Sequence, residues 1–371
     1  MRVLMTGGGT AGHVNPAIAI ANTIKEYEPE CEIAFVCSHL ARDKAQDLVP
    51  RAGYEKLYRL HILPSFKIYN PKNALTLISM IRSEGEAKKL IREFRPDVII
   101  GTGGFACYPV LNAGAKMGIP TLVHESNAIA GKAVLKLAGK VDCVMTNFDA
   151  TMAQLKSAKR TVTVGNPQVI GQKNAEKSDV ASGYSLSVLS FGGSLGAETL
   201  NRAYADTLSR LAEKYPNAEF YHAAGKRDFE DLKTVFAEKG LDKLKNVKLV
   251  DYIYDMDARM KRADLVISRA GAMTLSELSL LGKAAILVPS PFVAANHQFK
   301  NAKAISDKNA CILVEEKDFE TGKLISAVET LLSDEKKRRE LSENIKAFAK
   351  PDANRVIYDE IISVINSKKR K

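Results

Sequence analysis

Two short glycine-rich stretches decide how this chain folds: Gly7-Gly8-Gly9-Thr10-Ala11-Gly12 near the start and Gly192-Gly193-Ser194-Leu195-Gly196 near the middle. Each lies between a short apolar segment, typical of a buried strand, and a segment with helical periodicity. Glycines leave backbone N–H groups uncovered, and a helix N-terminus attracts anions, so each stretch predicts a turn that can approach a phosphate. The chain therefore contains two nucleotide-binding halves.

Strand and helix patterns alternate through both halves. The expected strands of the first half are 2–6, 32–37, 97–100, 121–124, 143–146 and 161–164, and those of the second are 187–191, 219–222, 247–250, 265–268, 285–289 and 311–314. This alternation predicts two doubly wound α/β domains of the Rossmann type, facing each other across a central cleft. We expect domains at 1–164 and 165–350. Residues 351–371 form a separate helix and basic tail, and our hypothesis is that this helix crosses back to the first domain.

Composition narrows the class of protein. The 371 residues fit two domains, and the five cysteines are odd in number and form no C-x-x-C pair, which favours a reducing compartment without a disulfide framework or zinc site. Because Met1 leads directly into the first strand, we expect no signal peptide, and no apolar run is long enough to span a bilayer. The net charge of +11 favours anionic partners. Nucleic acid is not expected, since Trp is absent and basic residues are not interleaved with aromatic ones.

The first glycine stretch matches the G-x-G-x-x-G pattern of dinucleotide-binding domains through Gly7, Gly9 and Gly12. A nicotinamide site also needs an acidic residue at the end of the second strand, and here that strand ends Val36-Cys37-Ser38-His39. An oxidoreductase is therefore disfavoured. The continuation to Pro16 places His13 at the start of a helix, where it is a candidate general base for activating a sugar hydroxyl. The alternative is that His13 only caps or packs the helix.

The second half offers several candidate contacts for a nucleotide sugar. Ser194 and the neighbouring Gly193 could hold a diphosphate, although a tight turn explains these glycines equally well. The stretch 268–274 leads from a strand to a helix that carries Glu277, a candidate partner for ribose hydroxyls or else an exposed acid favoured by the helix dipole. The segment 296–301 offers amide and imidazole groups to a sugar.

Asp255-Met256-Asp257 has the D-x-D spacing that some sugar transferases use to bind a metal. We favour a different interpretation, in which Asp255 accepts backbone N–H groups at the start of a helix. Since the glycine turns already supply positive helix ends for phosphate, no metal and no tightly bound cofactor is expected.

Taken together, seven stretches resemble one family. They are 7–16, 101–105, 124–127, 165–167, 192–197, 269–277 and 296–302, in the order in which that family has them. The chain resembles the MurG family of UDP-N-acetylglucosamine transferases from residue 1 to about 315. The resemblance implies a GT-B fold and an inverting transfer of GlcNAc from UDP-GlcNAc to the C4 hydroxyl of the muramoyl sugar of undecaprenyl-pyrophosphoryl-MurNAc-pentapeptide (lipid I), which gives lipid II in peptidoglycan synthesis.

The resemblance also implies roles for particular residues. Catalysis would involve His13, Glu125 and Asn127, and the acceptor side of the first domain would include Thr10, Gly12, Gly104, Phe105 and His124. The UDP-GlcNAc contacts would be Thr10, Gly12, Asn127, Gly193, Ser194, Ile253, Met256, Ala272, Met273, Thr274, Glu277, His297 and Gln298. Among these, Ser194 would lie near the phosphates, Ile253 and Met256 near uracil, Glu277 on the ribose and Gln298 on the GlcNAc.

Several positions depart from the family pattern. Phe105 stands where the family commonly has Tyr, Gln168 and Val169 stand where Val-Arg is usual, Leu195 replaces a polar residue, and Ala130 stands where proline is frequent. These changes affect the neighbourhood of the acceptor and the diphosphate. Two alternatives therefore stay open: a related transferase with another acceptor, and a non-catalytic protein with the same fold.

A polyprenyl-linked acceptor must be met at the cytoplasmic face of the cell membrane, so we expect peripheral binding to an anionic membrane surface. Residues 60–81 could form a shallow interfacial patch. Its apolar members are Leu60, Ile62, Leu63, Phe66, Ile68, Leu75, Leu77, Ile78 and Ile81, flanked by Arg59, Lys67, Lys72 and Arg82. The alternative is an ordinary helix packed on the sheet with a loop before it.

Overall fold

The computed structural model describes residues 1–62, 73–168, 183–193 and 196–370, except for the side chains of residues 73–78, 80 and 294. The chain divides into two compact units, Met1–Gly171 with Lys350–Lys371, and Gln172–Ala349. The first unit thus extends a few residues past the expected boundary at 164. The reason is local, because the backbone N–H of Gln168 donates to Asn354 Oδ1 at 2.8 Å and the Gln168 side chain donates to two carbonyls of the 350–351 segment.

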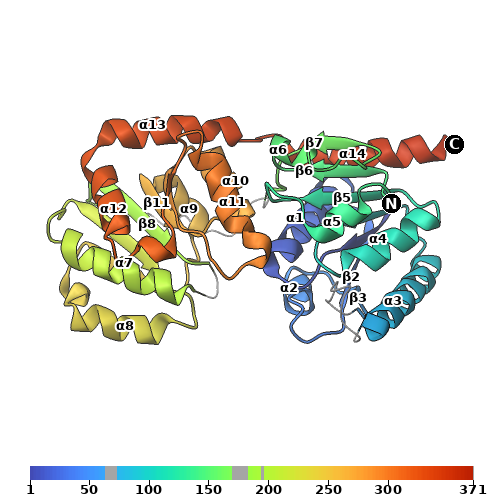
Figure 1. The fold of residues 1–371 in the computed structure, drawn as a ribbon, viewed down its shortest axis with the longest axis horizontal. Coiled ribbons are helices and arrows are strands. Elements are labelled where there is room, and N and C mark those ends of the chain that lie inside the picture. Colours follow the sequence, from blue (N-terminus) through green and yellow to red (C-terminus); the bar gives the residue numbers. More distant parts are fainter. Residues whose placement is uncertain (63–72, 169–182, 194–195, 371) are drawn as a thin grey trace. The chain divides into compact units, whose positions relative to one another are not determined.

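The described part of the first unit contains a parallel sheet of seven strands in the order β3-β2-β1-β4-β5-β6-β7 (Figure 1). The strands are β1 Arg2–Thr6, β2 Glu32–Ser38, β3 Leu57–Leu60, β4 Val98–Gly101, β5 Thr121–Glu125, β6 Cys143–Thr146 and β7 Thr161–Thr163. Their helices are α1 Ala11–Tyr27, α2 Ala45–Arg51, α3 Asn73–Phe94, α4 Cys107–Lys116, α5 Lys132–Leu137, α6 Asp149–Met152 and α14 Ala353–Lys369. The strand order reverses between β1 and β4, which is the position where doubly wound sheets bind ligands.

Alternating side chains of β1 build a core on each face of this sheet. Val3 and Met5 join a cluster with α1 and α14, while Leu4 joins a second cluster with α3 and α4. Successive strand residues point to opposite faces, so an apolar run such as Val3-Leu4-Met5 requires helices on both sides. These two layers fix the carboxyl end of β1, from which the first glycine turn begins.

The second unit repeats this design with a six-stranded parallel sheet in the order β10-β9-β8-β11-β12-β13 among the residues described there. The strands are β8 Leu186–Phe191, β9 Ala218–Ala223, β10 Val247–Val250, β11 Leu265–Ser268, β12 Ala284–Leu287 and β13 Ile312–Leu313. The helices are α7 Glu198–Leu211, α8 Phe229–Glu238, α9 Met256–Arg262, α10 Ala272–Leu281, α11 His297–Ser306, α12 Lys323–Ser333 and α13 Glu335–Ile345, with short 3-10 turns at Leu241–Lys243, Ala294–Asn296, Glu316–Asp318 and Lys346–Phe348. The strand order again reverses beside the strand that leads into a glycine turn, here β8.

The last helix, α14, packs on the first unit, as the sequence hypothesis held. Tyr358 stacks on Tyr27 of α1 with ring centroids 4.5 Å apart, and its hydroxyl donates to Glu28 at 2.8 Å. Arg160 pairs with Glu360 at 2.7 Å, beside Ile357 and Ile361, which are fully buried in the core. The helix therefore completes the hydrophobic core of the first unit.

The 60–81 segment differs from the expected membrane patch where it is described. Leu60 and Ile62 are buried, because β3 pairs with β2 and Leu60 lies opposite Ser38. Strand β3 was not predicted, since an edge strand of four residues with two exposed side chains has a weak pattern. Ile81 is 66% exposed on α3. The remaining apolar members, Leu63, Phe66, Ile68, Leu75, Leu77 and Ile78, lie outside the described residues or have side chains outside them. Among the described residues, no helix has the length and apolar character needed to cross a bilayer.

Candidate functional site

His13 lies in the first turn of α1, directly after the glycine turn that follows β1. Its Nδ1 is 3.1 Å from the Thr10 hydroxyl, and its backbone N–H donates to the Thr10 carbonyl at 3.0 Å. The Thr102 hydroxyl donates to the His13 carbonyl at 2.6 Å, which ties this helix start to the loop after β4. The imidazole is partly exposed, and Thr10 and Gly12 beside it are exposed. The structure thus brings three predicted residues together at the carboxyl edge of the first sheet.

The glycine turn after β4 packs against this imidazole. Gly103 and Gly104 have φ of 95° and 78°, a region that side chains rarely adopt. A Cβ on Gly103 would lie 2.8 Å from Cδ2 of His13, and a Cβ on Gly104 would lie 2.2 Å from the Gly8 carbonyl oxygen. Both glycines are therefore required by close approach as well as by conformation. The Phe105 ring packs over Gly9, where an added Cβ would lie 2.8 Å from it.

Glu125 stands at the carboxyl end of β5 and holds the loop that follows. Oε1 accepts the backbone and side-chain N–H groups of Asn127 at 3.0 Å each, and Oε2 accepts the backbone N–H of Gly131 at 2.7 Å. The residue is 5% exposed, and burial raises the pKa of its carboxyl. Its contacts are those of a residue that positions the partly exposed Asn127, so the structure supports a positioning role for Glu125 more than the predicted catalytic one.

His124, which the sequence predicts on the acceptor side, is buried in the structure. Its side chain is fully buried, with Nε2 2.8 Å from the Gly165 carbonyl oxygen and Nδ1 3.3 Å from the Ser126 hydroxyl. Successive side chains of a strand point to opposite faces of the sheet, so His124 and Glu125 of β5 lie on opposite faces. The His124 side chain lies on a face that is buried in the protein. Burial lowers the pKa of His124 to about 4, so the ring is neutral near pH 7. Its role is to connect β5 to the segment that leaves the first unit.

The second glycine turn follows β8, but two of its predicted residues, Ser194 and Leu195, lie outside the described residues. Gly193 and Gly196 have φ of 100° and 86°, which supports a turn that needs glycine. The Gly196 N–H donates to the Gly193 carbonyl at 3.0 Å. A Cβ on Gly196 would lie 2.6 Å from Asp228 Oδ2, whose carboxylate is paired with Arg227. Val169, named with Leu195 as a departure from the family, is likewise not described.

The loop between β11 and α10 presents the predicted ribose and phosphate contacts. Ala272, Met273 and Thr274 occupy the first turn of α10 and are partly exposed. Glu277 lies one turn further along α10. The alternative that it is a first-turn acid favoured by the helix dipole therefore does not apply. The residue is exposed, yet the protein around it raises the pKa of its carboxyl to about 7, first by desolvation and then through the charge of Asp257. Glu277 is thus an acid that titrates near neutral pH.

The β10–α9 loop carries Ile253 and Met256. Ile253 is 4% exposed, and Met256 is partly exposed at the start of α9. Asp255 stands at the N-cap position, but its carboxylate accepts from Arg259 Nε at 2.9 Å and makes no cap bond to the described backbone, which corrects the predicted role. The Asp255 carboxylate binds the guanidinium of Arg259 in place of the backbone N–H groups at the start of α9, because a hydrogen bond from a charged donor is the stronger one. Asp257 pairs with Lys261 at 2.6 Å.

His297 and Gln298 begin α11, after the loop that leaves β12. Gln298 Oε1 accepts the backbone N–H of Ser290 at 2.8 Å, so the side-chain oxygen is held and its amide nitrogen is oriented away from that bond. Ala295 and Asn296 before it have positive φ, which shapes the sharp entry into the helix. Both predicted residues are partly exposed at the carboxyl edge of the second sheet.

Two arrangements at these edges carried no sequence signal that we recognised. Asp43 is 1% exposed and accepts the backbone N–H of Gly9 in the first glycine turn, although Arg42-Asp43-Lys44 has the composition of a solvated surface stretch. Arg269 pairs with Glu316 and donates to the Val288 carbonyl, which ties the β11–α10 loop to the turn after β13 and to the loop after β12. Pairs between residues this far apart in the sequence can be identified only from the folded structure.

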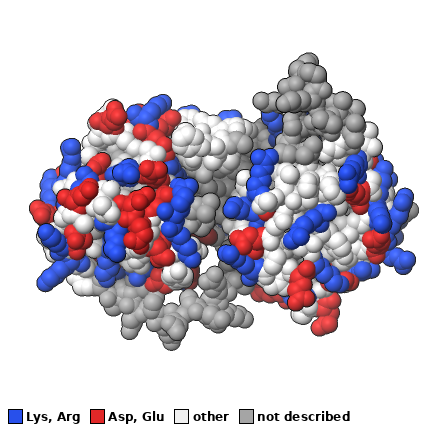
Figure 2. Space-filling model, turned by 90° about the horizontal axis from the view of Figure 1, so that it is seen from below, with Lys and Arg blue, Asp and Glu red and all other residues white. Residues whose placement is uncertain are grey.

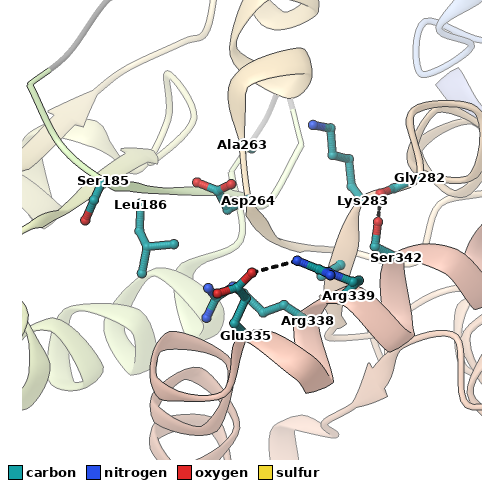
Figure 3. Close-up of a pocket in the computed structure, with 11 residues that line it drawn as sticks. Ser185, Leu186, Ala263, Asp264, Gly282, Lys283, Glu335, Arg338, Arg339 and Ser342 are labelled. Atoms are coloured by element: carbon teal, nitrogen blue, oxygen red, sulfur yellow. Dashed lines mark hydrogen bonds and ion pairs between the residues drawn. The ribbon is translucent and has the colours of Figure 1, made fainter.

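A pocket of about 420 Å³ lies in the second unit at the opposite edge of its sheet, where β8, β11 and β12 begin (Figure 3). Its polar groups already have protein partners: Arg339 pairs with Glu335, Lys283 donates to the Lys261 carbonyl, and Ser342 donates to the Gly282 carbonyl. None of the predicted site residues lines it. We therefore assign the chemistry to the carboxyl edges.

Comparison with known proteins fits this arrangement. The glycosyltransferase family 28 N-terminal domain matches residues 3–146, and the family 28 C-terminal domain matches residues 187–357. The chain is 36% identical to the UDP-N-acetylglucosamine--N-acetylmuramyl-(pentapeptide) pyrophosphoryl-undecaprenol N-acetylglucosamine transferase of Alkaliphilus metalliredigens over 99% of this chain and 100% of that protein. It is 38% identical to the protein of the same name from Bacteroides fragilis, over 98% and 96% of the two chains.

Solved structures agree. The crystal structure of Acinetobacter baumannii MurG superposes with a TM-score of 0.77 at 27% identity, covering 98% of this chain and 99% of that one. A UDP-GlcNAc 2-epimerase from Neisseria meningitidis, at 14% identity and a TM-score of 0.68 over 98% and 100% of the two chains, shares the fold alone. The two parallel sheets are those of a GT-B glycosyltransferase. The chain belongs to glycosyltransferase family 28 and, within it, to the MurG family.

Proposed function

We propose that this protein transfers GlcNAc from UDP-GlcNAc to the muramoyl sugar of lipid I, giving lipid II for peptidoglycan synthesis. The observation that carries the proposal is the imidazole of His13, held by Thr10 and by the Gly103-Gly104 turn at the carboxyl edge of the first sheet. It belongs to a chain whose full-length relatives carry this transferase name. Membership of the family makes the protein a glycosyltransferase, and the residues at the carboxyl edges supply its chemistry.

In the proposed reaction, His13 acts as general base. Nε2 takes the proton of the C4 hydroxyl of the acceptor as the oxygen attacks the anomeric carbon of GlcNAc. The bond from that carbon to the diphosphate oxygen breaks, and UDP leaves with the electron pair, so the configuration at the anomeric carbon inverts. A correctly placed base contributes about a hundred- to ten-thousand-fold in rate. Asn127, whose side chain is held by Glu125, can donate to the acceptor sugar in this proposal.

The donor side of the proposal rests on the second unit. Glu277 accepts hydrogen bonds from the ribose hydroxyls, and Ile253 and Met256 contact the uracil. The first turn of α10, with Ala272, Met273 and Thr274, directs its N–H groups toward the diphosphate, together with the turn that contains Gly193. The Gln298 amide nitrogen, oriented by the bond of its oxygen to Ser290, contacts the GlcNAc. Departure of UDP is assisted by these helix termini.

We propose that the leaving diphosphate needs no metal. The two acids of the D-x-D pattern are engaged with cations of the protein, Asp255 with Arg259 at 2.9 Å and Asp257 with Lys261 at 2.6 Å. Positive helix ends then supply the charge that a divalent ion would otherwise supply. Activity in excess EDTA equal to that in Mg²⁺ supports this point, and loss of activity in EDTA that Mg²⁺ restores contradicts it.

The acceptor is lipid-linked, so we propose that the first unit works at an anionic membrane surface. The first unit contains 27 Lys and Arg against 17 Asp and Glu, whereas the second contains 27 against 26, so nearly all the net charge of +11 belongs to the first. Figure 2 shows that basic side chains are spread over the visible face of this unit and not gathered in one spot. Sedimentation with anionic vesicles at low salt, and release at high salt, tests this proposal.

The test of the reaction uses purified protein, labelled UDP-GlcNAc and a short-chain lipid I analogue. Formation of a labelled disaccharide product supports the proposal. If the protein binds UDP-GlcNAc but forms no product with lipid I, the acceptor is a different one. If it does not bind UDP-GlcNAc, the donor assignment also fails.

A further inference from the structure

A buried carboxylate lies beneath the first glycine turn. Asp43 is 1% exposed, and its Oδ1 accepts the backbone N–H of Gly9 at 2.8 Å and that of Ala45 at 3.1 Å. Its Oδ2 accepts the backbone N–H of Ser38 at 2.9 Å. Within the described parts of the chain, Asp43 forms no ion pair, so three amides stabilise its negative charge.

The carboxylate is in direct contact with the turn. A Cβ on Gly8 would lie 2.6 Å from Asp43 Oδ2, so glycine is needed here because the acid lies beneath it. Glycine-rich turns at the end of a first strand use such amides to bind the phosphate of a ligand. In this chain, an internal anion already occupies the Gly9 amide.

The second glycine turn is built differently. The carboxylate near it, Asp228, is paired with Arg227 at 2.7 Å and 3.2 Å, and the Gly196 amide binds the Gly193 carbonyl. The charge of Asp228 is therefore neutralised by a cation. The two turns share a sequence pattern, but within their described residues an internal anion is bound to an amide in the first turn, at Gly9, and not in the second.

Contacts lead from the Asp43 carboxylate to the imidazole of His13. Gly9, which Asp43 holds, is followed by Thr10, whose hydroxyl is 3.1 Å from His13 Nδ1. Gly8, which lies on the carboxylate, is in close contact through its carbonyl with Gly104, beside the same imidazole. A shift of the first glycine turn would therefore move both Thr10 and Gly104, which lie beside the His13 imidazole.

We propose that Asp43 is a positioning residue: its carboxylate takes the place of a phosphate in the first glycine turn and fixes the turn so that His13 is aimed at the acceptor. A consequence is that no substrate phosphate uses the Gly9 amide. The predicted effect on turnover rests on the proposed function. The statement that the Asp43 carboxylate occupies the anion position at the Gly9 amide does not. The experiment measures the two separately.

The test compares wild type with Asp43→Ala and Asp43→Asn, using Asp47→Asn as the matched control. Asp47 lies in the neighbouring helix α2, is half-exposed and pairs with Arg51 at the surface, so its substitution by Asn makes the same charge change as Asp43→Asn away from the turn. Because small misplacements of a reacting group cost up to about a hundredfold in rate, we expect Asp43→Ala to lower kcat at least about tenfold. KM for UDP-GlcNAc and UDP affinity by calorimetry should stay within about twofold, since the proposed contacts to uracil, ribose and diphosphate lie on the other unit.

Adding sodium formate to Asp43→Ala tests the anion position directly. Formate carries the lost carboxylate and fits the space left by Asp43→Ala, so it should restore kcat several-fold, whereas sodium chloride at equal ionic strength should not. Without any substrate, formate should raise the melting temperature of Asp43→Ala but not that of wild type or Asp47→Asn. This melting experiment tests the anion position even if wild type forms no product with lipid I. If Asp43→Ala does not fold, Asp43→Asn replaces it, with a kcat loss expected at unchanged UDP affinity.

Wild-type kcat in either Asp43 variant would overturn the positioning role. Formate that neither stabilises Asp43→Ala nor restores its turnover would overturn the anion position. A loss of UDP affinity as large as the loss of kcat would show general damage to the fold, and would overturn the proposal as well.

Discussion

The hydroxyl oxygen of Thr10 lies 3.1 Å from Nδ1 of His13, within the first turn of α1. A neutral imidazole carries its hydrogen on one nitrogen only, and the hydrogen bond of the other decides which. For Nε2 to accept a proton from the acceptor, Nδ1 must carry the hydrogen and donate it to Thr10. In that tautomer the Thr10 hydroxyl accepts the Nδ1 hydrogen, and we expect this bond to favour the reactive form of the base.

Replacing Thr10 by Val should lower kcat, because Val keeps the shape of the side chain but cannot accept the Nδ1 hydrogen. We expect a loss of about tenfold or more, in the range of the contribution of a general base. Thr10→Ser keeps the hydroxyl and should retain most activity. Steady-state kinetics with a lipid I analogue checks this, and equal kcat values for the two variants would exclude Thr10 as the orienting partner.

Glu125→Gln should destabilise the loop after β5. The carboxylate accepts three N–H groups, and an amide would turn a donor toward one of them, which costs about 1–3 kcal/mol for a buried group. We expect a lower melting temperature and a lower kcat at unchanged UDP affinity. Glu93→Gln, an exposed change in the same unit, is the control. A stable Glu125→Gln protein with a large kcat loss and an altered pH profile would instead place Glu125 at the reacting atoms.

Donor binding should depend on pH through Glu277. Its pKa is raised to about 7, so the carboxylate that accepts ribose hydroxyls is only partly formed at pH 6 and largely formed at pH 8. Affinity for UDP-GlcNAc, measured by calorimetry, should rise over this interval. Glu277→Gln should bind more weakly and lose this pH dependence. Asp257→Asn removes a charge that raises the pKa and should move the midpoint to lower pH. An identical pH profile in all three proteins would contradict the role of Glu277.

Acid should destabilise both units through buried histidines. Desolvation lowers the pKa of His124 to about 4 and that of His222 to about 3, from an ordinary value of 6.5. Since the folded pKa is the lower one, the stability is complete above about pH 6.5 and is lost as pH falls toward the folded value. At pH 5 the loss is about 2 kcal/mol for each ring.

Calorimetric melting of wild type, His124→Gln and His222→Gln at pH 7 and pH 5 checks this prediction. Glutamine can donate to the Gly165 carbonyl or to the Asn201 side chain as the rings do, but it does not titrate. Each variant should therefore lose less melting temperature between the two pH values than wild type. Equal losses would show that other groups cause the acid sensitivity.

Much of the fold could be predicted from the sequence. The expected strands are present with ends shifted by no more than two residues, because buried parallel strands are apolar runs bounded by turn residues. The edge strand β3 was missed because half of its side chains face water. The extent of the first unit was also missed, since the bonds of Gln168 to the segment before α14 join residues more than 180 positions apart.

The candidate site was predictable as a set of turns but not in its internal contacts. Glycines marked the turns correctly, because positive φ and close packing exclude other residues. The pattern could not distinguish an exposed polar residue from a buried one, so the burial of His124 was not foreseen. It also could not show that Asp43, 34 residues from Gly9, lies beneath the turn.

The central claim is tested most directly by transfer of labelled GlcNAc from UDP-GlcNAc to a short-chain lipid I analogue, with wild type and His13→Ala measured together. We predict a disaccharide product from wild type and a kcat about a hundredfold or more lower for His13→Ala, at unchanged UDP affinity. Product formed at the wild-type rate by His13→Ala, or UDP-GlcNAc binding without product in wild type, would contradict the account.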